Sequence, residues 1–321
     1  MIQELAQRLI SGDRRALARL ITVVEREEPE TLEVMRAVHP HTGRGYCIGV
    51  TGPPGAGKST LVDQLTFLLR SGTEKGDSDS PKVSILAADP TSPFSGGAIL
   101  ADRVRMQRHY TDQGVFIRSM ATRGSHGGLP RSTRRAVKLL DAYGSDLMIV
   151  ETVGVGQAEL DIMDVADTVV VVLVPESGDS MQAIKAGLME IADVFVVNKA
   201  DRPGADIMTK DISVMLTLDS TERDWAPPIL ATQAHTGVGL QELTTAIEEH
   251  RKGAKETGSL ARRRRARRRN EFFQTIREQA EEQVVRLTDG DGRLTSLLEQ
   301  VESDKVDPYT AALEALKNRS P

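Results

Sequence analysis

The stretch "GPPGAGKST", residues 52–60, decides the fold. It satisfies the pattern G-x-x-x-x-G-K-[ST], directly after the apolar run "YCIGV" and directly before "LVDQLTFLLR", which has a helical composition. In such a strand-loop-helix unit the glycines let successive backbone N–H groups converge on phosphate oxygens, and the helix N-terminus adds its positive dipole end. A glycine-rich turn without a ligand does not explain the Lys-Ser pair. We therefore predict a phosphate-binding loop made of Gly52, Pro53, Pro54, Gly55, Ala56, Gly57, Lys58, Ser59 and Thr60.

Two side chains of this loop carry the chemistry that the motif predicts. The Lys58 ammonium can reach the β- and γ-phosphates of a nucleotide, and the Ser59 hydroxyl can be a ligand of Mg²⁺. Both residues open the predicted helix. The motif thus indicates a site for a nucleotide bound together with Mg²⁺.

Short β-rich runs recur from residue 45 onward. They are apolar throughout rather than alternating, which is typical of strands covered by helices on both faces. Segments of helical length lie between most of them, such as 59–70, 131–143, 180–192 and 239–250. We therefore expect an α/β fold with a mostly parallel, doubly wound sheet. The expected strands are YCIGV (46–50), KVSILAA (82–88), GVFIRSM (114–120), DLMIVE (146–151), TVVVVLV (168–174), DVFVVNK (193–199) and PILAT (228–232).

Helical regions flank the predicted sheet. Residues 1–42 have apolar positions at helical spacing on both sides of an "SGD" break, where Asp13 is a predicted N-cap. From residue 256 a long charged helix precedes two short helical segments. We expect an N-terminal helical extension (1–42), the sheet domain (43–255) and a C-terminal helical arm (256–321). One face of the long helix is apolar and needs a partner to bury it: Phe272, Phe273, Ile276, Ala280 and Val284.

The run "VFVVNKAD", residues 194–201, predicts the base of the nucleotide. It places N-K-x-D at the end of a strand, where an open α/β sheet binds ligands. The Asp201 carboxylate can accept from the N1–H and the exocyclic amine of guanine, a donor pair that adenine lacks. Asn198 is expected at the N7/O6 edge, and the aliphatic stem of Lys199 can lie over the nucleotide. Together with the phosphate loop, the motif favours GTP and GDP.

A second stretch, "ATQAHTGVGL" at 231–240, is expected to close over the guanine O6. Its backbone amides at Gln233, Ala234 and His235 would supply the donors.

Three acidic residues lie where they could reach a metal ion bound beside the phosphate loop. In "ADPTSPFSGGAILADRVRM" (88–106), Asp89 ends the second predicted strand and Asp102 follows a Ser- and Gly-rich turn, while Glu151 ends the fourth strand. Mg²⁺ usually takes a few protein oxygens beside water and phosphate. Asp102 can join only if the turn folds over the triphosphate as a switch, and an N-cap for "RVRMQRHY" is an equal alternative. The candidate metal ligands are Ser59, Asp89, Asp102 and Glu151.

The composition is that of an ordinary globular protein. The chain is 39% hydrophobic and 27% charged, with a net charge of -5. Its longest apolar run, "TVVVVLVP" at 168–175, is far shorter than the roughly 20 residues of a membrane helix. We expect no membrane segment and no secretion signal. The single cysteine, Cys47, forms no internal disulfide, so a cytoplasmic location is expected.

The run "RRRRARRR", residues 262–269, has two possible roles. Clustered arginines can neutralise nucleic-acid phosphates, but they can also form a solvated helix face paired with the acidic "REQAEEQ" behind them. Aromatic residues make up only 3% of the chain, so platforms for base stacking are scarce. Nucleic-acid binding is therefore the less favoured interpretation.

Several longer strings resemble one family. "ADPTSPFSGGAILADRVRM", "ATRGSHGGL", "ETVGVGQAE", "GDSMQAIKAGLMEIAD" and "NKAD" are similar to segments of the methylmalonyl-CoA-mutase-associated GTPases. The likeness runs almost end to end and is looser in the arginine-rich helix. The loop "TQAHTGVG" departs from the usual Ser-Ala pattern, and "TEKGDSDSP" looks longer and more polar than expected.

The resemblance implies a function beyond the nucleotide. It implies a P-loop GTPase domain whose C-terminal arm forms a homodimer, with Mg²⁺-site acids at Asp89, Asp102 and Glu151. It also implies a third switch containing Gln182 and Lys185. The partner would be an adenosylcobalamin-dependent acyl-CoA mutase, whose cofactor loading and repair the GTPase gates.

The roles in hydrolysis divide simply, because phosphoryl transfer depends mostly on positioning and charge neutralisation. Lys58 and Mg²⁺ would offset charge on the γ-phosphoryl group. Asp89 or Glu151 would orient the attacking water. Gln157 is a further candidate, although a polar residue opening a helix is the commoner explanation. Arg118 or Arg123 could stabilise the reaction in cis. The candidate catalytic residues are Lys58, Asp89, Glu151 and Gln157.

Two other function classes fit parts of the sequence. A nickel-insertion GTPase needs a soft metal site, for which the chain offers only Cys47 and scattered histidines, including the weak pair His39 and His41. A kinase would need an acceptor pocket and a base that the sequence does not indicate. Phosphate release from GTP alone would separate a kinase from a GTPase.

Overall fold

The computed structural model describes residues 2–71, 80–89, 106–121, 129, 131–152, 158–175, 187–218, 224–288 and 292–317. The chain divides into two compact units, Met1–Arg263 and Arg264–Pro321. The first unit contains the sheet and every predicted nucleotide motif. The three-part division expected from the sequence stays a prediction.

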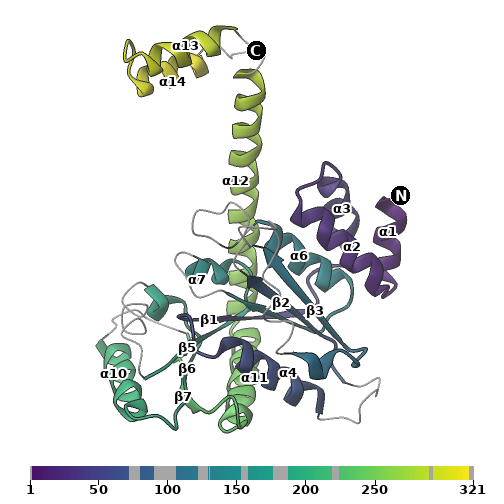
Figure 1. Ribbon diagram of the computed structural model, residues 1–321, viewed down its shortest axis with the longest axis vertical. Helices are drawn as coiled ribbons and strands as arrows, with labels where there is room; N and C mark the ends of the chain where they lie inside the picture. The colour runs from purple at the N-terminus through teal and green to yellow at the C-terminus, as the bar shows by residue number, and fades with distance from the viewer. Residues whose placement is uncertain are drawn as a thin grey trace. The chain divides into compact units, whose positions relative to one another are not determined.

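A seven-stranded sheet forms the centre of the first unit (Figure 1). Its strand order is β3-β2-β4-β1-β5-β6-β7, and all the neighbouring strands pair in parallel. The predicted fold class is confirmed, and each predicted strand run is a strand. The bounds are β1 Tyr46–Thr51, β2 Val83–Asp89, β3 Val115–Ala121, β4 Leu147–Glu151, β5 Thr168–Leu173, β6 Val194–Asn198 and β7 Ile229–Thr232.

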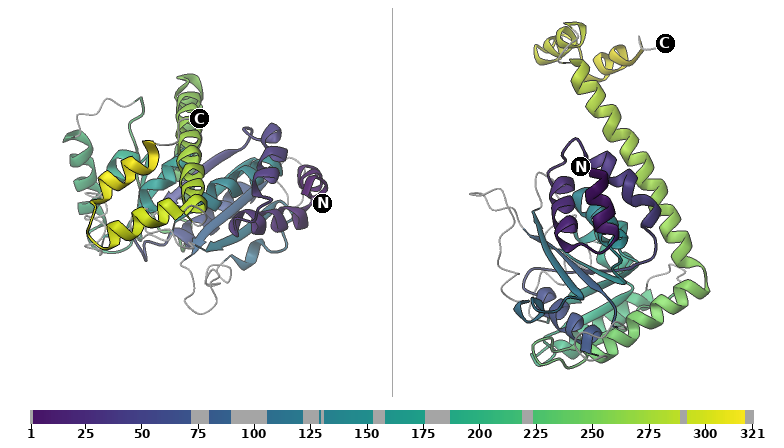
Figure 2. Two further views of the ribbon diagram at one scale, coloured as in Figure 1. Left: turned by 90° about the horizontal axis from the view of Figure 1, so that it is seen from above. Right: turned by 90° about the vertical axis from the view of Figure 1, so that its right-hand side faces the viewer.

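Helices cover both faces of this sheet (Figures 1 and 2). Along β5, Val169 and Val171 face one core, and Val170 and Val172 face the other. This double burial explains why the strands read as continuous apolar runs. The first core is closed by α6 (Arg131–Ala142) and α10 (Ala205–Leu218), and the second by α4 (Lys58–Ser71) and α11 (Leu240–Glu256). Within the predicted helical segment 180–192, residues 187–192 are described and contain α9 (Met189–Ile191).

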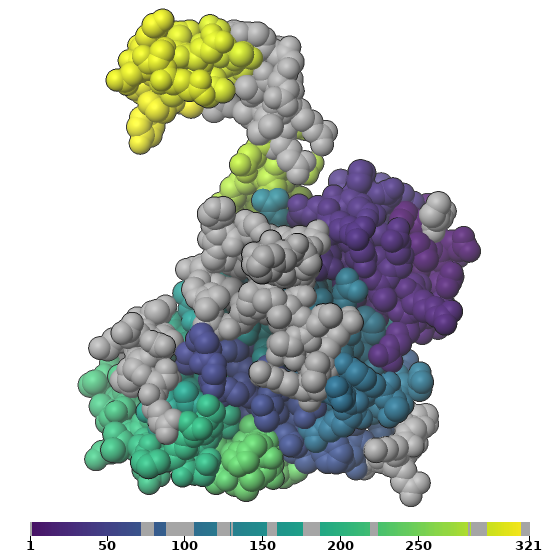
Figure 3. Space-filling model, in the orientation of Figure 1, coloured from purple at the N-terminus to yellow at the C-terminus, as the bar shows by residue number. Residues whose placement is uncertain are grey.

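The N-terminal helices belong to the first unit and form the purple lobe in Figure 3. They are α1 (Ile2–Ile10), α2 (Arg14–Glu25) and α3 (Thr31–Val38). The predicted N-cap is confirmed, because the Asp13 carboxylate accepts from the backbone N–H groups of Arg15 and Ala16 at 2.8 and 3.1 Å. Leu9, Leu17 and Leu20 are fully buried in the core that α6 also lines.

Three aspartates that each lie just before a strand connect neighbouring strands at the amino-terminal edge of the sheet. Each carboxylate accepts a hydrogen bond from one backbone N–H at or just before the start of the neighbouring strand, which satisfies a donor at the end of the ladder. The pairs are Asp146 with Lys82 N (2.8 Å), Asp167 with Cys47 N (3.1 Å) and Asp193 with Val169 N (2.9 Å). These bonds fix the register of β1, β2 and β5.

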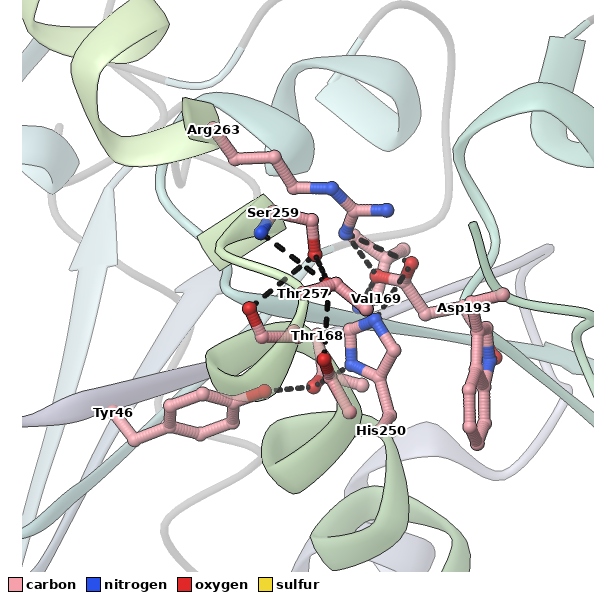
Figure 4. Close-up of polar contacts among 11 residues, drawn as sticks. Tyr46, Thr168, Val169, Asp193, His250, Thr257, Ser259 and Arg263 are labelled. Atoms are coloured by element: carbon pink, nitrogen blue, oxygen red, sulfur yellow. Dashed lines mark hydrogen bonds and ion pairs between the residues drawn. The ribbon is translucent and has the colours of Figure 1, made fainter. Parts of the chain in front are cut away.

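Asp193 also anchors the N-terminal part of α12 (Ser259–Thr288) (Figure 4). Its Oδ1 lies 2.9 Å from Arg263 Nη1 and 3.2 Å from His250 Nε2. His250 Nδ1 lies 2.8 Å from the Thr168 hydroxyl, which bonds the Tyr46 hydroxyl at 2.6 Å. Burial raises the pKa of Asp193, but the His250 hydrogen bond and the charges of His250 and Arg263 outweigh it and hold the pKa below its usual value.

The second unit is helical. Beyond Arg263 it contains the rest of α12, then α13 (Gly292–Glu302) and α14 (Pro308–Lys317). On α12 the predicted apolar face is exposed: the exposed fractions of Phe272, Phe273 and Ile276 are 61%, 48% and 48%. Arg269 lies over the Phe273 ring. Within the described part of the chain, no helix combines the length and apolarity that crossing a membrane requires.

Candidate nucleotide-binding site

The phosphate loop turns between β1 and α4 through backbone conformations that favour glycine. Gly52, Gly55 and Gly57 have φ values of 136°, 73° and 88°. A side chain at Gly52 would clash with the Val172 carbonyl oxygen, and one at Gly57 would clash with the Asn198 amide. The loop therefore depends on glycine both for its turn and for its close approach to β5 and β6.

Lys58 and Ser59 begin α4 and lie at the carboxyl edge of the sheet. The Lys58 side chain is buried, and its Nζ donates to the carbonyl oxygens of Gly52 at 2.8 Å and Pro53 at 3.0 Å. The Ser59 hydroxyl donates to Glu151 Oε1, at the end of β4, over 2.6 Å. The first two residues of α4 thus supply a buried positive charge and, together with Glu151, two oxygen atoms that could bind a metal ion.

The residues at this point fit Mg²⁺. The ion prefers oxygen ligands and usually takes only one or two from the protein when it also binds phosphate. Ser59 and Glu151 supply such a pair. Asp89 ends β2, which pairs with β4, so its backbone lies on the same sheet edge. Its side chain and the whole of Asp102 lie outside the described residues.

The Asn198 amide joins the phosphate loop to the predicted guanine loop. Its side chain is only 2% exposed, and Nδ2 donates to the Ala56 carbonyl oxygen at 2.8 Å. Its Oδ1 accepts from Ala234 N at 3.0 Å and from the Thr232 hydroxyl at 3.1 Å. The side chain expected at the N7/O6 edge of the base therefore serves as an internal connection between three segments.

The remaining guanine-motif residues lie around this connection. Lys199 has a left-handed backbone (φ 57°), and its Nζ donates to the Gly55 carbonyl oxygen at 2.8 Å. Asp201 is exposed just beyond it. The loop of Gln233 and His235 is closed by a bond from Gln233 N to Val238 O at 3.0 Å. The structure therefore brings the N-K-x-D motif, the phosphate loop and the predicted guanine loop together.

One buried acid near the site was missed in the sequence. Glu159 lies in α7 (Ala158–Asp161) and is 8% exposed. Its backbone oxygen accepts from the Thr51 hydroxyl at 3.3 Å, and Thr51 immediately precedes Gly52. Burial raises the pKa of the Glu159 carboxyl, and the positive charge of Lys58 offsets part of that rise. The sequence signal that could have drawn attention to Glu159 is its position two residues after Gln157 in "ETVGVGQAE".

The remaining residues proposed from the sequence for catalysis or switching are not found at this site in the described part of the chain. Gln157, Arg123, Gln182 and Lys185 lie outside the described residues. Arg118, considered as a cis arginine, points from β3 to the N-terminal helices, where it bonds Glu25 at 2.7 Å and the Thr22 hydroxyl at 3.3 Å. Among the residues that the structure describes, no three His, Cys, Asp or Glu side chains are grouped to hold a metal.

Similarity to known proteins agrees with this geometry. A family profile described as methylmalonyl Co-A mutase-associated GTPase MeaB matches residues 17–289. A Pyrococcus abyssi protein, named provisionally as a GTPase, is 50% identical over 320 residues, which cover 99% of this chain and 96% of the relative. The mitochondrial methylmalonic aciduria type A homolog of Mus musculus is 32% identical over 335 residues, covering 97% of this chain and 78% of the relative.

A solved structure extends the comparison to the fold. The crystal structure of an LAO/AO transport system kinase is similar with a TM-score of 0.67 at 28% identity, covering 98% of this chain and 96% of the other. The chain belongs to the family of methylmalonyl-CoA mutase-associated GTPases, MeaB.

Proposed function

We propose that the first unit binds GTP or GDP together with Mg²⁺ and hydrolyses GTP. The observation that carries the proposal is the Asn198 side chain, which bonds the Ala56 carbonyl of the phosphate loop and the Ala234 N–H of the predicted guanine loop. This connection supports a single site that holds the phosphates at one end and the base at the other. The family membership supports the guanine nucleotide as the ligand.

We assign the phosphate contacts to the loop from Gly52 to Thr60. Its N–H groups and the N-terminus of α4 would receive the phosphates. Lys58 would exchange its two carbonyl partners for β- and γ-phosphate oxygens. Ser59 and Glu151 would hold Mg²⁺ with Asp89 and Asp102, and the bound ion would supply neutralisation of phosphate charge. The attacking water would be oriented by Asp89, Glu151 or Gln157.

The base contacts follow from the second motif. Asp201 would accept from the N1–H and exocyclic amine of guanine, and the amides of Gln233, Ala234 and His235 would face O6. Asn198 would act by holding the two loops in register, with Lys199 packed beside it on Gly55. Adenine offers Asp201 no matching donor pair, so the site would discriminate against adenine nucleotides.

We further propose that the GTPase is a chaperone of an adenosylcobalamin-dependent acyl-CoA mutase. It would gate loading of the cofactor and protect the mutase or release damaged cofactor. Membership of the methylmalonyl-CoA mutase-associated GTPases supports this client. A homodimer formed through the C-terminal arm would cover the exposed Phe272, Phe273 and Ile276.

The test of the enzymatic proposal is phosphate release from GTP by the purified chain with no acceptor added. Slow release that needs Mg²⁺ and disappears in Lys58→Ala supports a GTPase, because that variant removes the cation from the phosphate loop. Release that requires an added acceptor would instead identify a kinase. The circular dichroism of Lys58→Ala should match that of the parent chain, which separates lost chemistry from lost folding.

The test of the client proposal is co-purification with candidate mutases. Association that changes between GDP and a non-hydrolysable GTP analogue supports nucleotide-dependent gating. Absence of association in every nucleotide state would remove the mutase from the proposal and leave the GTPase activity untouched.

A further inference from the structure

Two threonines are buried where β1 and β4 end. The exposed fractions of Thr51 and Thr152 are 0% and 1%. Their hydroxyl oxygens lie 2.9 Å apart, and Thr51 Oγ1 also lies 3.3 Å from the backbone oxygen of Glu159 in α7. Burying a hydroxyl is costly unless it is hydrogen-bonded, so these contacts stabilise both threonines in the interior.

The direction of these hydrogen bonds follows from the number of hydrogens. A hydroxyl carries one donor hydrogen, and a carbonyl oxygen only accepts. Thr51 therefore donates to the Glu159 oxygen, which leaves Thr152 as the donor to Thr51. The result is one directed chain of bonds, from the residue after Glu151, through the residue before Gly52, to α7.

The Glu151 side chain lies on the α4 side of the sheet. Ile149 faces the second core, which α4 helps to close, and Val150 faces the first. Because side chains alternate along a strand, Glu151 points to the same side as Ile149. There it accepts from the Ser59 hydroxyl of α4 at 2.6 Å.

The two threonines hold the same strand end from the other side. Val50 faces the second core, so Thr51, the next residue of β1, faces the first. The Thr152 N–H donates to the Val50 carbonyl oxygen at 3.0 Å, which extends the β1–β4 ladder by one residue past Glu151. The end of β4 is thus fixed on both faces, by Ser59 on one and by the threonine pair on the other.

This position matters because Ser59 and Glu151 are the oxygen pair proposed to hold Mg²⁺. Mg²⁺ requires near-ideal octahedral geometry, so a displaced ligand binds it more weakly. Groups outside the set of ligands that fix a ligand's orientation therefore raise metal affinity. Thr152 adjoins Glu151 along the chain, and Thr51 adjoins the phosphate loop that leads to Ser59.

We propose that Thr51 and Thr152 are positioning residues that hold Glu151 in register with the phosphate loop and so raise the affinity of the nucleotide-bound chain for Mg²⁺. The inference rests on the proposed function, because it requires Mg²⁺ at Ser59 and Glu151. The hydroxyls touch neither the ion nor the phosphates in this role. They act through the backbone of the two segments that they join.

The experiment is calorimetric titration of the full chain with a non-hydrolysable GTP analogue over a series of magnesium chloride concentrations. The magnesium concentration at the midpoint of the rise in nucleotide affinity reports Mg²⁺ binding. Thr51→Val and Thr152→Val keep the branched shape and remove one hydroxyl each. Each midpoint should rise on the order of tenfold, as expected when a group that orients a metal ligand is lost. Nucleotide affinity in EDTA should match that of the parent.

Three further variants separate positioning from folding. Thr51→Ser and Thr152→Ser keep the hydroxyl and should return the midpoint to that of the parent. Thr31→Val removes another buried hydroxyl, which bonds the Val23 carbonyl oxygen at 3.4 Å in the N-terminal helices, and should leave the midpoint unchanged. If one of the two valine variants does not fold, the other carries the test, because both remove the same bond.

The double variant, with valine at Thr51 and at Thr152, tests whether the hydroxyls act as one unit. The effects of removing two partners of one bond are not additive. The double variant should therefore need no more Mg²⁺ than Thr51→Val alone. A shift equal to the product of the two single shifts would show that the hydroxyls act independently and would overturn the proposed chain.

The outcomes separate this inference from the function on which it rests. If the parent binds no guanine nucleotide, or binds the analogue without any dependence on Mg²⁺, the proposed function fails. If the parent shows that dependence and the valine variants keep its midpoint, with or without a lower melting temperature, the threonines only stabilise the fold and the inference is overturned. An equal shift in Thr31→Val would also overturn it, because any buried hydroxyl would then have the effect.

Discussion

Replacing Asn198 by alanine tests whether this side chain is structural before any nucleotide binds. The substitution removes three hydrogen bonds, to Ala56 O, Ala234 N and the Thr232 hydroxyl, at a site that is 2% exposed. A net contribution of about 1 kcal/mol per bond gives a loss of about 3 kcal/mol in the free energy of unfolding. For a unit of this size, that corresponds to a fall in melting temperature of roughly 6–12 °C.

The assay is urea unfolding of the nucleotide-free chain, followed by circular dichroism and compared with Asn270→Ala. Asn270 is exposed on α12, so its substitution should leave stability within about 0.5 kcal/mol of the parent. Guanine-nucleotide affinity should fall in Asn198→Ala, because the phosphate and base loops are no longer held together.

The refuting result is equally specific. If Asn198→Ala unfolds at the same urea concentration as the parent but loses nucleotide affinity, the amide acts only on the base. The internal connection described for Asn198 would then contribute nothing in solution.

Three further predictions concern the base, the anchor of α12 and the arm. Asp201→Asn should relax the preference for GDP towards xanthosine diphosphate, and an unchanged ratio of the two dissociation constants would remove Asp201 from the base site. Because the folded pKa of Asp193 is held below the usual pKa of an aspartate, its stabilisation should be fully present above that usual pKa and be lost as pH falls through the folded pKa. Asp193→Asn should therefore lower the free energy of unfolding at pH 7 by roughly 3 kcal/mol and flatten the acid limb of urea unfolding measured against pH, whereas a parallel profile would contradict this role. Deleting residues 264–321 leaves the first unit whole and should convert a dimer to a monomer in light scattering, and a truncated dimer would place the interface in the first unit.

Much of the fold could be predicted because local chemistry specifies it. The glycines of 52–57 and the Lys-Ser pair mark a strand-loop-helix unit without reference to distant residues. The apolar runs mark buried strands because helices cover both faces of the sheet. Asp13 could be predicted as an N-cap because capping depends on the next two or three residues.

The rest depended on contacts between distant segments. Asn198 looks from its motif like a base-reading residue, and only the approach of β6 to the phosphate loop turns its amide towards Ala56. Glu159 reads as an ordinary acid at a helix start, and its burial accompanies the packing of the next turn on β1, where Gly49 has no side chain to displace Ile162. Arg263 belongs to the arginine run that was expected to form a solvated helix face, but it pairs with the buried Asp193 inside the first unit.

The most direct test of the central claim is calorimetric titration of the purified chain with GDP in the presence of Mg²⁺, with ADP as the comparison. The proposal predicts saturable heat with GDP, close to one nucleotide per chain, and none with ADP. Absence of binding with both GDP and a non-hydrolysable GTP analogue would contradict the assignment of the phosphate and guanine loops as one nucleotide site.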